Sequence, residues 1–311
     1  AGINGRGLPI AVVTDDIDGN TRNTRSPDIG ADEFAVSGVD AGIAIISPTR
    51  PALAGANTVR VRILNTRTTA ITSVSLTYTT ATVSVAETFT GLNIAPGNSQ
   101  VVSFTTPYTL SATSAANFTV NIIQVNGAAD EDASNNTAVI VNLRGALNGA
   151  YSVGTGLDFA TLDAALLALD QAGVAGPVQF NIAAGTTYTS QLALKPFAGA
   201  SATNTVTLQA ATGNRNDVIF RPASAPTSTL KYIIRFDPNA AYYVLNNLSI
   251  LPPTSLPTSN MYGIELRSNV NNITIKNALI NLCGSASTPG TTVREISVQP
   301  ATTYVENITV Q

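Results

Sequence analysis

A turn-rich acidic segment near the start of the chain has the residue types of a calcium loop. Asp16, Asp18 and Asn20 place oxygen-bearing side chains at alternate positions around Gly19, and hard cations such as Ca²⁺ prefer oxygen ligands. An EF-hand loop needs glycine at its sixth position and a bidentate glutamate at its twelfth, where this chain has threonine and proline. We therefore predict that these side chains accept hydrogen bonds from turn amides or pair with arginines, and we assign no metal site.

Two further groups of carboxylates have spacings that suggest chemistry. The run from Asp130 to Asn136 is strongly acidic and precedes a predicted strand, so we expect a solvated hairpin loop in preference to a metal site. Glu265 and Glu295 are separated by about one coil of the solenoid predicted below, and two carboxyl groups about 5 to 10 Å apart can hydrolyse a glycosidic bond. No neighbouring residue supports that pair, so we predict no catalytic residue.

The composition excludes several classes of site. The 311 residues include no histidine, which removes the commonest general base, the commonest zinc ligand and every histidine-dependent triad. The net charge of −3 argues against the basic surface that nucleic-acid binding requires. No apolar run approaches the ~20 residues of a membrane-spanning helix. Cys283 is the single cysteine, and its apolar neighbours predict a buried side chain. We therefore predict no metal, no cofactor, no nucleic-acid partner and no membrane span in this segment.

Aromatic side chains in the second half of the chain have two interpretations. They could form a platform for sugar rings, but aromatic residues in strands more often pack in the core or against the neighbouring coil. We expect core packing. The residues concerned are Tyr188, Tyr232, Tyr242, Tyr243, Tyr262 and Tyr304.

Residues 35–145 carry the alternation typical of strands that have one exposed face. Val59–Ile63 and Val74–Tyr78 alternate apolar and polar side chains. Turns rich in proline, glycine and asparagine separate about seven such strands, and this spacing predicts a β-sandwich. The other predicted strands are Ala41–Ile46, Thr82–Thr88, Ser99–Phe104, Asn117–Gln124 and Thr137–Leu143.

Residues 146–311 combine one helix with many short strands. An apolar stripe at helical spacing, with Thr161 as N-cap and Gly173 as stop, predicts a helix over about 162–172. Polar, asparagine-rich turns separate the strands that follow. The predicted strands are Val178–Ile182, Leu192–Leu194, Val206–Leu208, Val218–Phe220, Ile233–Phe236, Tyr242–Leu245, Leu248–Leu251, Ile264–Leu266, Ile273–Ile275, Ile296–Val298 and Ile308–Val310.

Three segments of this region read as copies of one unit. Residues 246–250, 271–275 and 306–310 each begin with a polar pair that ends in asparagine, followed by apolar residues that alternate with serine or threonine. The offsets of 25 and 35 residues are typical of one solenoid coil, the second with an inserted loop. Asparagines at repeated turn positions can stack as a hydrogen-bonded ladder, so we expect them to be structural.

Several segments also resemble known families. Asp16 to Phe34, D-I-D-G-N-T-R followed by P-D-I-G-A-D-E-F, resembles the closing segment of right-handed parallel β-helices in secreted surface proteins of Bacteroidota. That resemblance implies that residues 1–34 close the last coil of an upstream β-helix. The residues to which it assigns this role are Asp16, Asp18, Gly19, Asn20, Arg22, Pro27, Asp28, Ile29, Gly30 and Glu33.

The other two regions resemble modules of bacterial surface proteins. L-N-I-A-P-G-N-S-Q-V-V-S-F and the late N-N-T-A strand make residues 35–145 similar to Ig-like or fibronectin-like modules. G-T-G-L-D-F-A-T-L, an amphipathic helix and P-V-Q-F-N-I make residues 146–311 similar to the start of pectate-lyase-like β-helices, in which the helix caps the solenoid. The expected fold is therefore all-β: an Ig-like β-sandwich flanked by the end of one right-handed parallel β-helix and the capped start of another.

These expectations together favour a structural role. Solenoids and sandwiches in series make stiff rods, and this composition offers little chemistry. We expect a non-enzymatic, cell-surface part of a giant extracellular adhesin or filament, for which the resemblance implies type IX secretion. It would contact other copies of itself, neighbouring modules or cell-surface glycans. The alternative is a polysaccharide-binding or lyase-like β-helix protein.

Overall fold

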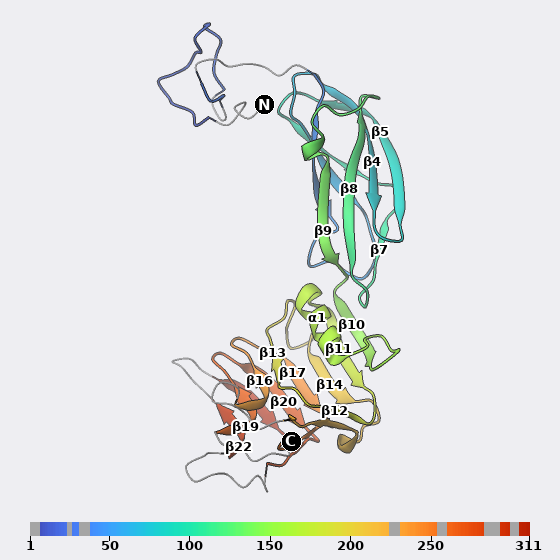
Figure 1. Ribbon diagram of the computed structural model, residues 1–311, viewed down its shortest axis with the longest axis vertical. Helices are drawn as coiled ribbons and strands as arrows, with labels where there is room; N and C mark the ends of the chain where they lie inside the picture. The colour runs from blue at the N-terminus through green and yellow to red at the C-terminus, as the bar shows by residue number, and fades with distance from the viewer. Residues whose placement is uncertain are drawn as a thin grey trace. The chain divides into compact units, whose positions relative to one another are not determined.

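The computed structural model describes residues 7–23, 27–30, 38–223, 231–253, 260–282, 293–298 and 305–311. Strands dominate this part of the chain, which confirms the all-β prediction (Figure 1). Packing divides the chain into two compact units. Unit 1 comprises Ala1–Ser47, Thr58–Thr106 and Phe118–Ile140, and unit 2 comprises Pro48–Asn57, Pro107–Asn117 and Val141–Gln311. Cys283, Glu33 and Tyr304 lie outside the described residues.

Unit 1 is built from two antiparallel sheets. The first has the order β1–β3–β6 and the second has the order β5–β4–β8–β9. Alternate residues of β3 and β4 are buried, and the ring of Tyr78 lies 5.0 Å from the ring of Phe104, so the two sheets share one core. The strands are β1 (Ala41–Ser47), β3 (Arg60–Asn65), β4 (Ile71–Thr79), β5 (Ser84–Ile94), β6 (Ser99–Ser103), β8 (Ala116–Val125) and β9 (Thr137–Leu143).

These seven strands confirm the seven that alternation predicts, with ends that differ by a few residues. Two further strands, β2 (Gly55–Asn57) and β7 (Tyr108–Leu110), were not predicted and pair with each other. Each is three residues long, which is too short for a period of two to be recognised.

The N-terminal segment contains the predicted hydrogen-bonded turn. One carboxylate oxygen of Asp16 accepts the amides of Asp18 (2.9 Å) and Asn20 (2.7 Å), and the other accepts the Asn20 side-chain amide (3.0 Å). Gly19 occupies the left-handed region with φ of 80°, which closes the turn. Arg22 donates to the backbone carbonyls of Asp28 and Gly30. Asp16 therefore organises backbone amides, as predicted.

Unit 2 contains a parallel β-solenoid of about four coils. Three parallel sheets run along it, with the orders β10–β11–β14–β17–β20–β23, β12–β15–β18–β21 and β13–β16–β19–β22. The strands are β10 (Leu147–Val153), β11 (Val174–Ile182), β12 (Thr186–Tyr188), β13 (Leu192–Leu194), β14 (Val206–Ala210), β15 (Val218–Phe220), β16 (Tyr232–Phe236), β17 (Tyr243–Asn246), β18 (Ser249–Ile250), β19 (Met261–Leu266), β20 (Asn271–Lys276), β21 (Leu279–Ile280), β22 (Val293–Val298) and β23 (Glu306–Val310).

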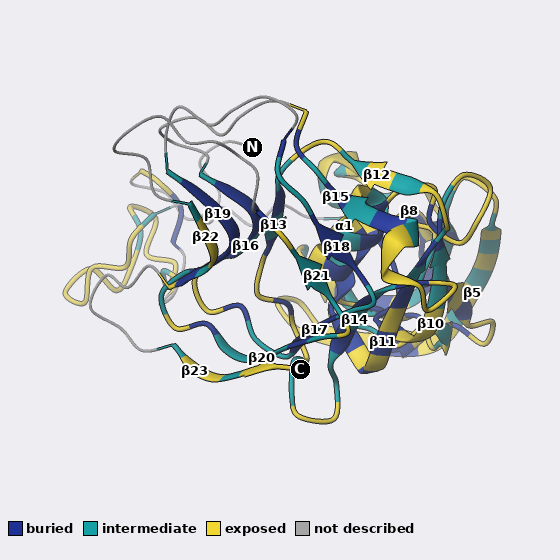
Figure 2. Cartoon of the chain, turned by 90° about the horizontal axis from the view of Figure 1, so that it is seen from below, coloured by how far each residue is buried: buried dark blue, intermediate teal, exposed yellow. Residues whose placement is uncertain are grey.

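The solenoid core consists of apolar rows that cross the coils. Each side chain packs on the equivalent residue of the next coil because the strands pair in register. One such row contains Phe180, Leu208, Leu245 and Ile275, all buried. Figure 2 shows the same burial along β16 and β19, drawn in dark blue.

The helix α1 (Leu162–Ala172) has the predicted bounds and signals. The Thr161 hydroxyl accepts the Ala164 amide at 3.1 Å, and the Gly173 amide donates to the Leu169 carbonyl at 2.9 Å with φ of 67°. The buried face of α1 belongs to the same apolar cluster as the solenoid core. No helix in the described ranges is long and apolar enough to cross a membrane.

The register corrects one of the two predicted repeat offsets. Asn271 pairs with Glu306, which confirms the offset of 35 residues. Residues 271–276 pair with 241–246, however, so the preceding coil is 30 residues away and the predicted offset of 25 is wrong. Residues 246–250 instead turn a corner from β17 into β18. The two segments look alike because both corners place asparagine in the left-handed region, at Asn247 (φ 53°) and Asn272 (φ 52°).

A ladder of side-chain amides follows one edge of the largest sheet, and of the asparagines in the predicted repeat units only Asn246 belongs to it. Gln209 donates to Asn181 (2.8 Å), Asn246 donates to Gln209 (2.9 Å) and Asn277 donates to Asn246 (3.0 Å). We call Asn181, Gln209, Asn246 and Asn277 the amide ladder. It links four successive coils, so these polar residues are structural.

Candidate functional site

The structure does not assemble Glu265 and Glu295 into a facing pair. Glu265 on β19 pairs in register with Ser297 on β22, and Glu295 lies two residues earlier, beside Gly263. Glu265 is only 4 % exposed, whereas Glu295 is exposed. The 30-residue spacing therefore brings the two onto adjacent strands but out of register and into different environments.

Glu265 instead belongs to a charged row on the sheet that contains β16 and β19. We define the charged row as Arg235, Asp237, Glu265 and Arg267. Arg235 pairs in register with Glu265, and its Nε lies 2.5 Å from Oδ1 of Asp237. Nε of Arg267 lies 3.2 Å from Oε2 of Glu265. Each ion pair joins residues two positions apart, but the two pairs become neighbours only through the coil register, so the row could not be predicted from the sequence.

The surroundings of the charged row favour a role in ligand binding or in stabilising the sheet over a role in proton transfer. The guanidinium carbon of Arg235 lies 4.5 Å from the ring centroid of Tyr232, a cation–π contact that helps to fix its position. Burial raises the pKa of Tyr232, so its hydroxyl stays protonated at neutral pH. Each carboxylate is already paired with a guanidinium, and the row is internally neutral. It offers no unpaired carboxylate for general acid catalysis.

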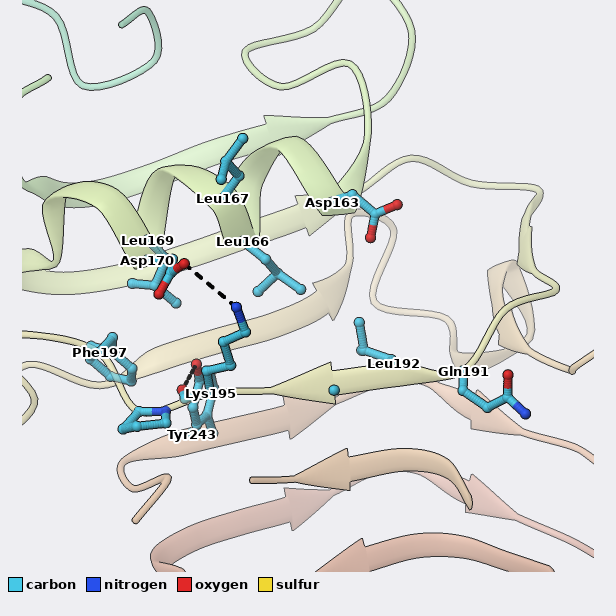
Figure 3. Close-up of a pocket in the computed structure, with 12 residues that line it drawn as sticks. Asp163, Leu166, Leu167, Leu169, Asp170, Gln191, Leu192, Lys195, Phe197 and Tyr243 are labelled. Atoms are coloured by element: carbon cyan, nitrogen blue, oxygen red, sulfur yellow. Dashed lines mark hydrogen bonds and ion pairs between the residues drawn. The ribbon is translucent and has the colours of Figure 1, made fainter. Parts of the chain in front are cut away.

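A cavity of about 260 Å³ lies between α1 and β13 (Figure 3). Its apolar part includes Leu166 from the helix, Leu192 from β13 and Phe197 from the following loop. The polar groups are Asp163 and Asp170 from the helix, together with Gln191 and Lys195. This mixture of apolar walls and a few polar groups is the usual make-up of a small-ligand pocket.

Some of the polar groups that line the cavity already interact with each other. Nζ of Lys195 lies 3.6 Å from Oδ2 of Asp170, as the dashed line in Figure 3 shows, and both side chains are about half exposed. The buried Tyr243 hydroxyl donates to the Lys195 carbonyl at 2.7 Å, which fixes the backbone of that loop. Burial also raises the pKa of Tyr243. The cavity can accept polar groups by hydrogen bonding, but its walls present no activated nucleophile.

The tyrosines that the structure describes do not form an exposed platform, and Tyr242 is partly buried against the core. Tyr232, Tyr243 and Tyr262 are buried, and Tyr188 stacks on Phe220 with 4.8 Å between the ring centroids. Burial raises the pKa of Tyr188 to about 12. Core packing, the expected role, is therefore confirmed for these four residues.

The acidic loop holds the start of β1 as well as meeting solvent. Asp130 accepts the Ala41 amide at 3.2 Å, and Glu131 accepts the Val39 amide at 3.1 Å. Asp40, 1 % exposed, accepts the Asp132 amide at 3.2 Å and the Thr66 hydroxyl. Within the described ranges, no group of three or more histidine, cysteine, aspartate or glutamate side chains is arranged to hold a metal ion.

Comparisons with protein-family models, with curated proteins and with solved structures found no match to this chain.

Proposed function

We propose that this chain is a structural part of a giant extracellular adhesin or filament, in which it forms a rigid stalk for surface attachment, gliding or contact with other cells. The observation that carries the proposal is the use of polar side chains inside the solenoid. The amide ladder spends its hydrogen-bonding groups on neighbouring coils, and the charged row pairs its charges within each coil, Arg235 with Asp237 and Arg267 with Glu265. Apolar rows in register supply the rest of the cohesion. A stack of this kind resists bending and local unfolding because each coil is held by both of its neighbours.

We further propose finer assignments for the three regions. Residues 35–145 are an Ig-like or fibronectin-like module, which the division of strands into β1–β3–β6 and β5–β4–β8–β9 supports. Residues 146–311 are the first part of a right-handed parallel β-helix with α1 as its cap, which the shared apolar cluster supports. Residues 1–34 close an upstream β-helix. Leu8, Ile10 and Val12 are 88 %, 63 % and 88 % exposed, which favours a segment that covers an apolar surface.

The source, location and export route follow from the resemblance alone. We propose a secreted, cell-surface protein of the Bacteroidota type that leaves the cell by type IX secretion. Its partners are other copies of the same chain, neighbouring modules of the same polypeptide, or surface glycans.

Electron microscopy of the native protein sheared from the cell surface tests the structural role. Long fibres with alternating thick and thin segments would support a string of solenoids and sandwiches. Compact particles the size of one or two domains would refute it. Immunogold labelling with an antibody against residues 38–223 ensures that the fibres counted contain this chain.

The second candidate is a polysaccharide-binding or lyase-like protein, favoured by the cavity beside α1. The structural role and this second role can be distinguished by incubating the native protein with a panel of acidic and neutral polysaccharides. Released oligosaccharides are then analysed. Release that persists through purification would support the enzyme. Binding without release that is weakened by Lys195→Ala would support glycan recognition at the cavity.

A further inference from the structure

One face of unit 1 carries no charge. The residues of β4 that point away from the core are Ser73, Ser75, Thr77 and Thr79, since Val74, Leu76 and Tyr78 between them are buried. Register places Ser84, Ala86, Thr88 and Thr90 of β5 beside them on one side, and Thr119 and Asn121 of β8 on the other. We call these residues, with Thr137 and Val139 of β9, the hydroxyl face.

Hydrogen bonds between neighbouring side chains fix the positions of residues on the hydroxyl face. The Ser75 and Thr88 hydroxyls lie 2.9 Å apart, and the Thr137 hydroxyl donates to Oδ1 of Asn121 at 2.8 Å. Glu87, the one acidic residue of these four strands, accepts the Thr105 amide at 2.8 Å and alternates with the outward residues of β5. Short side chains in fixed positions lose little conformational entropy when another surface covers them.

The opposite sheet of unit 1 is different in charge. Arg60 and Arg62 of β3 are exposed on its outer side, beside Ser103 and Val101 of β6. No acidic residue occupies an outward position of β1, β3 or β6. Two copies that met through this sheet would set arginines against arginines, which costs free energy. Two copies that met through the hydroxyl face would desolvate no charge.

The hydroxyl face also has an apolar margin beside an edge strand, whose Val141 and Asn142 carbonyls accept hydrogen bonds from Arg50 at one end. Ile123 and Val139 are 53 % and 51 % exposed, and β9 is the last strand of its sheet. The segment Thr137–Leu143 contains no charge and no proline, which are the features that usually protect an edge strand from pairing. The margin adds apolar contact where the hydroxyls alone would give little hydrophobic gain.

We propose that the hydroxyl face is the lateral contact between copies of this chain. The inference rests on the proposed structural function, and names the surface through which stalks associate. Four strands about 4.8 Å apart and about 30 Å long give a patch of roughly 600 Å², somewhat below the ~800 Å² per partner of a stable interface. A single pair of modules therefore associates weakly. Repeated modules along a stalk convert the weak contact into lateral bundling.

Analytical ultracentrifugation of the 311-residue chain over a concentration series tests the contact. The wild-type weight-average mass should rise reversibly with concentration. Thr119→Lys, on the hydroxyl face beside Thr79, should weaken the association constant about tenfold or more, because it buries an ammonium group in the contact. The matched control Val101→Lys adds the same charge to the outer side of the other sheet and should change the constant less than about twofold.

Two outcomes would overturn the inference. The wild type staying monomeric at the highest soluble concentration is one, and equal weakening by both lysine variants is the other. Circular dichroism melting identifies a variant that has failed to fold, and Thr77→Lys on the same face then replaces it. Microscopy separates this result from the structural proposal. Single-width fibres that never bundle would refute the lateral contact and leave the proposed stalk intact. Compact particles whose dimerisation is still weakened by Thr119→Lys would refute the stalk and support the lateral contact.

Discussion

At the scale of single residues, the buried carboxylates of unit 1 are the groups most sensitive to solution conditions. Burial and, after it, the neighbouring Asp40 carboxylate raise the pKa of Asp130 from 3.8 to about 6. Nε of Arg67 lies 3.6 Å from Oε2 of Glu131. The start of β1 is therefore held by a carboxylate whose protonation changes in mildly acidic solution.

The sign of the resulting pH dependence follows from linkage. The folded state binds the Asp130 proton more tightly than the unfolded state, so this group stabilises the fold most below about pH 4. The contribution declines as the pH rises toward about 6 and stays constant above it. We expect the melting temperature of unit 1 to fall between these values, and Asp130→Asn to remove most of that slope.

Asp158 supplies a control of opposite sign. The Ser152 amide and hydroxyl donate to its carboxylate at 2.8 and 2.7 Å and lower its pKa. Its contribution is therefore present above its unfolded pKa and lost in acid, so Asp158→Asn should leave the Asp130 window unchanged. A melting temperature of the Asp130→Asn variant that still falls over this window would contradict the assignment.

At the scale of elements, the amide ladder makes a specific prediction about the solenoid. Asn246→Ala removes the acceptor of Asn277 and the donor to Gln209, so the half-buried Gln209 amide and the exposed Asn277 amide lose their partners. We expect a loss of about 1–3 kcal/mol in the free energy of unfolding, measured by urea titration. Thr207→Ala, which changes an outward residue of β14 in the same sheet, should cost less than about 0.5 kcal/mol. Equal costs would show that the ladder is incidental.

The helix N-cap gives a second prediction at this scale. Thr161→Ala removes the hydroxyl that accepts the Ala164 amide, and the expected cost is about 1 kcal/mol of unfolding free energy for unit 2. Thr161→Ser keeps an oxygen at the same place and should restore most of that loss. A serine variant as unstable as the alanine variant would mean that the methyl group, and not the hydrogen bond, matters.

What the sequence predicts at this scale depends on period and length. Alternation locates β3 and β4, and capping signals locate α1 to the residue. The mostly polar β12 and the two-residue β21 were not predicted, whereas β13 and β15, three-residue strands with apolar ends, were. The register between coils was mispredicted once, because asparagine turns a corner at Asn247 as well as at Asn272. The charged row was unpredictable for the same reason, since Arg235 and Glu265 meet only through that register.

At the scale of the whole molecule, the two units have separate cores and should unfold separately. We expect two transitions in differential scanning calorimetry. Phe118→Ala empties a buried site in unit 1, and Leu208→Ala does so in unit 2, each at an expected cost of about 2–5 kcal/mol. Each variant should shift one transition and leave the other in place. A single transition that both variants shift equally would show that the units fold as one.

The amide ladder has a direction as well as a strength. From Asn277 through Asn246 and Gln209 to Asn181, every side-chain nitrogen donates toward the preceding coil. Amide dipoles that point the same way polarise one another, so each added link strengthens those before it. A coil stacked in the opposite direction would place a side-chain amide nitrogen against another amide nitrogen, and the first hydrogen bond of the ladder would be lost. The ladder thus gives the solenoid a polarity, which favours the stacking of coils in one orientation and in one order during folding.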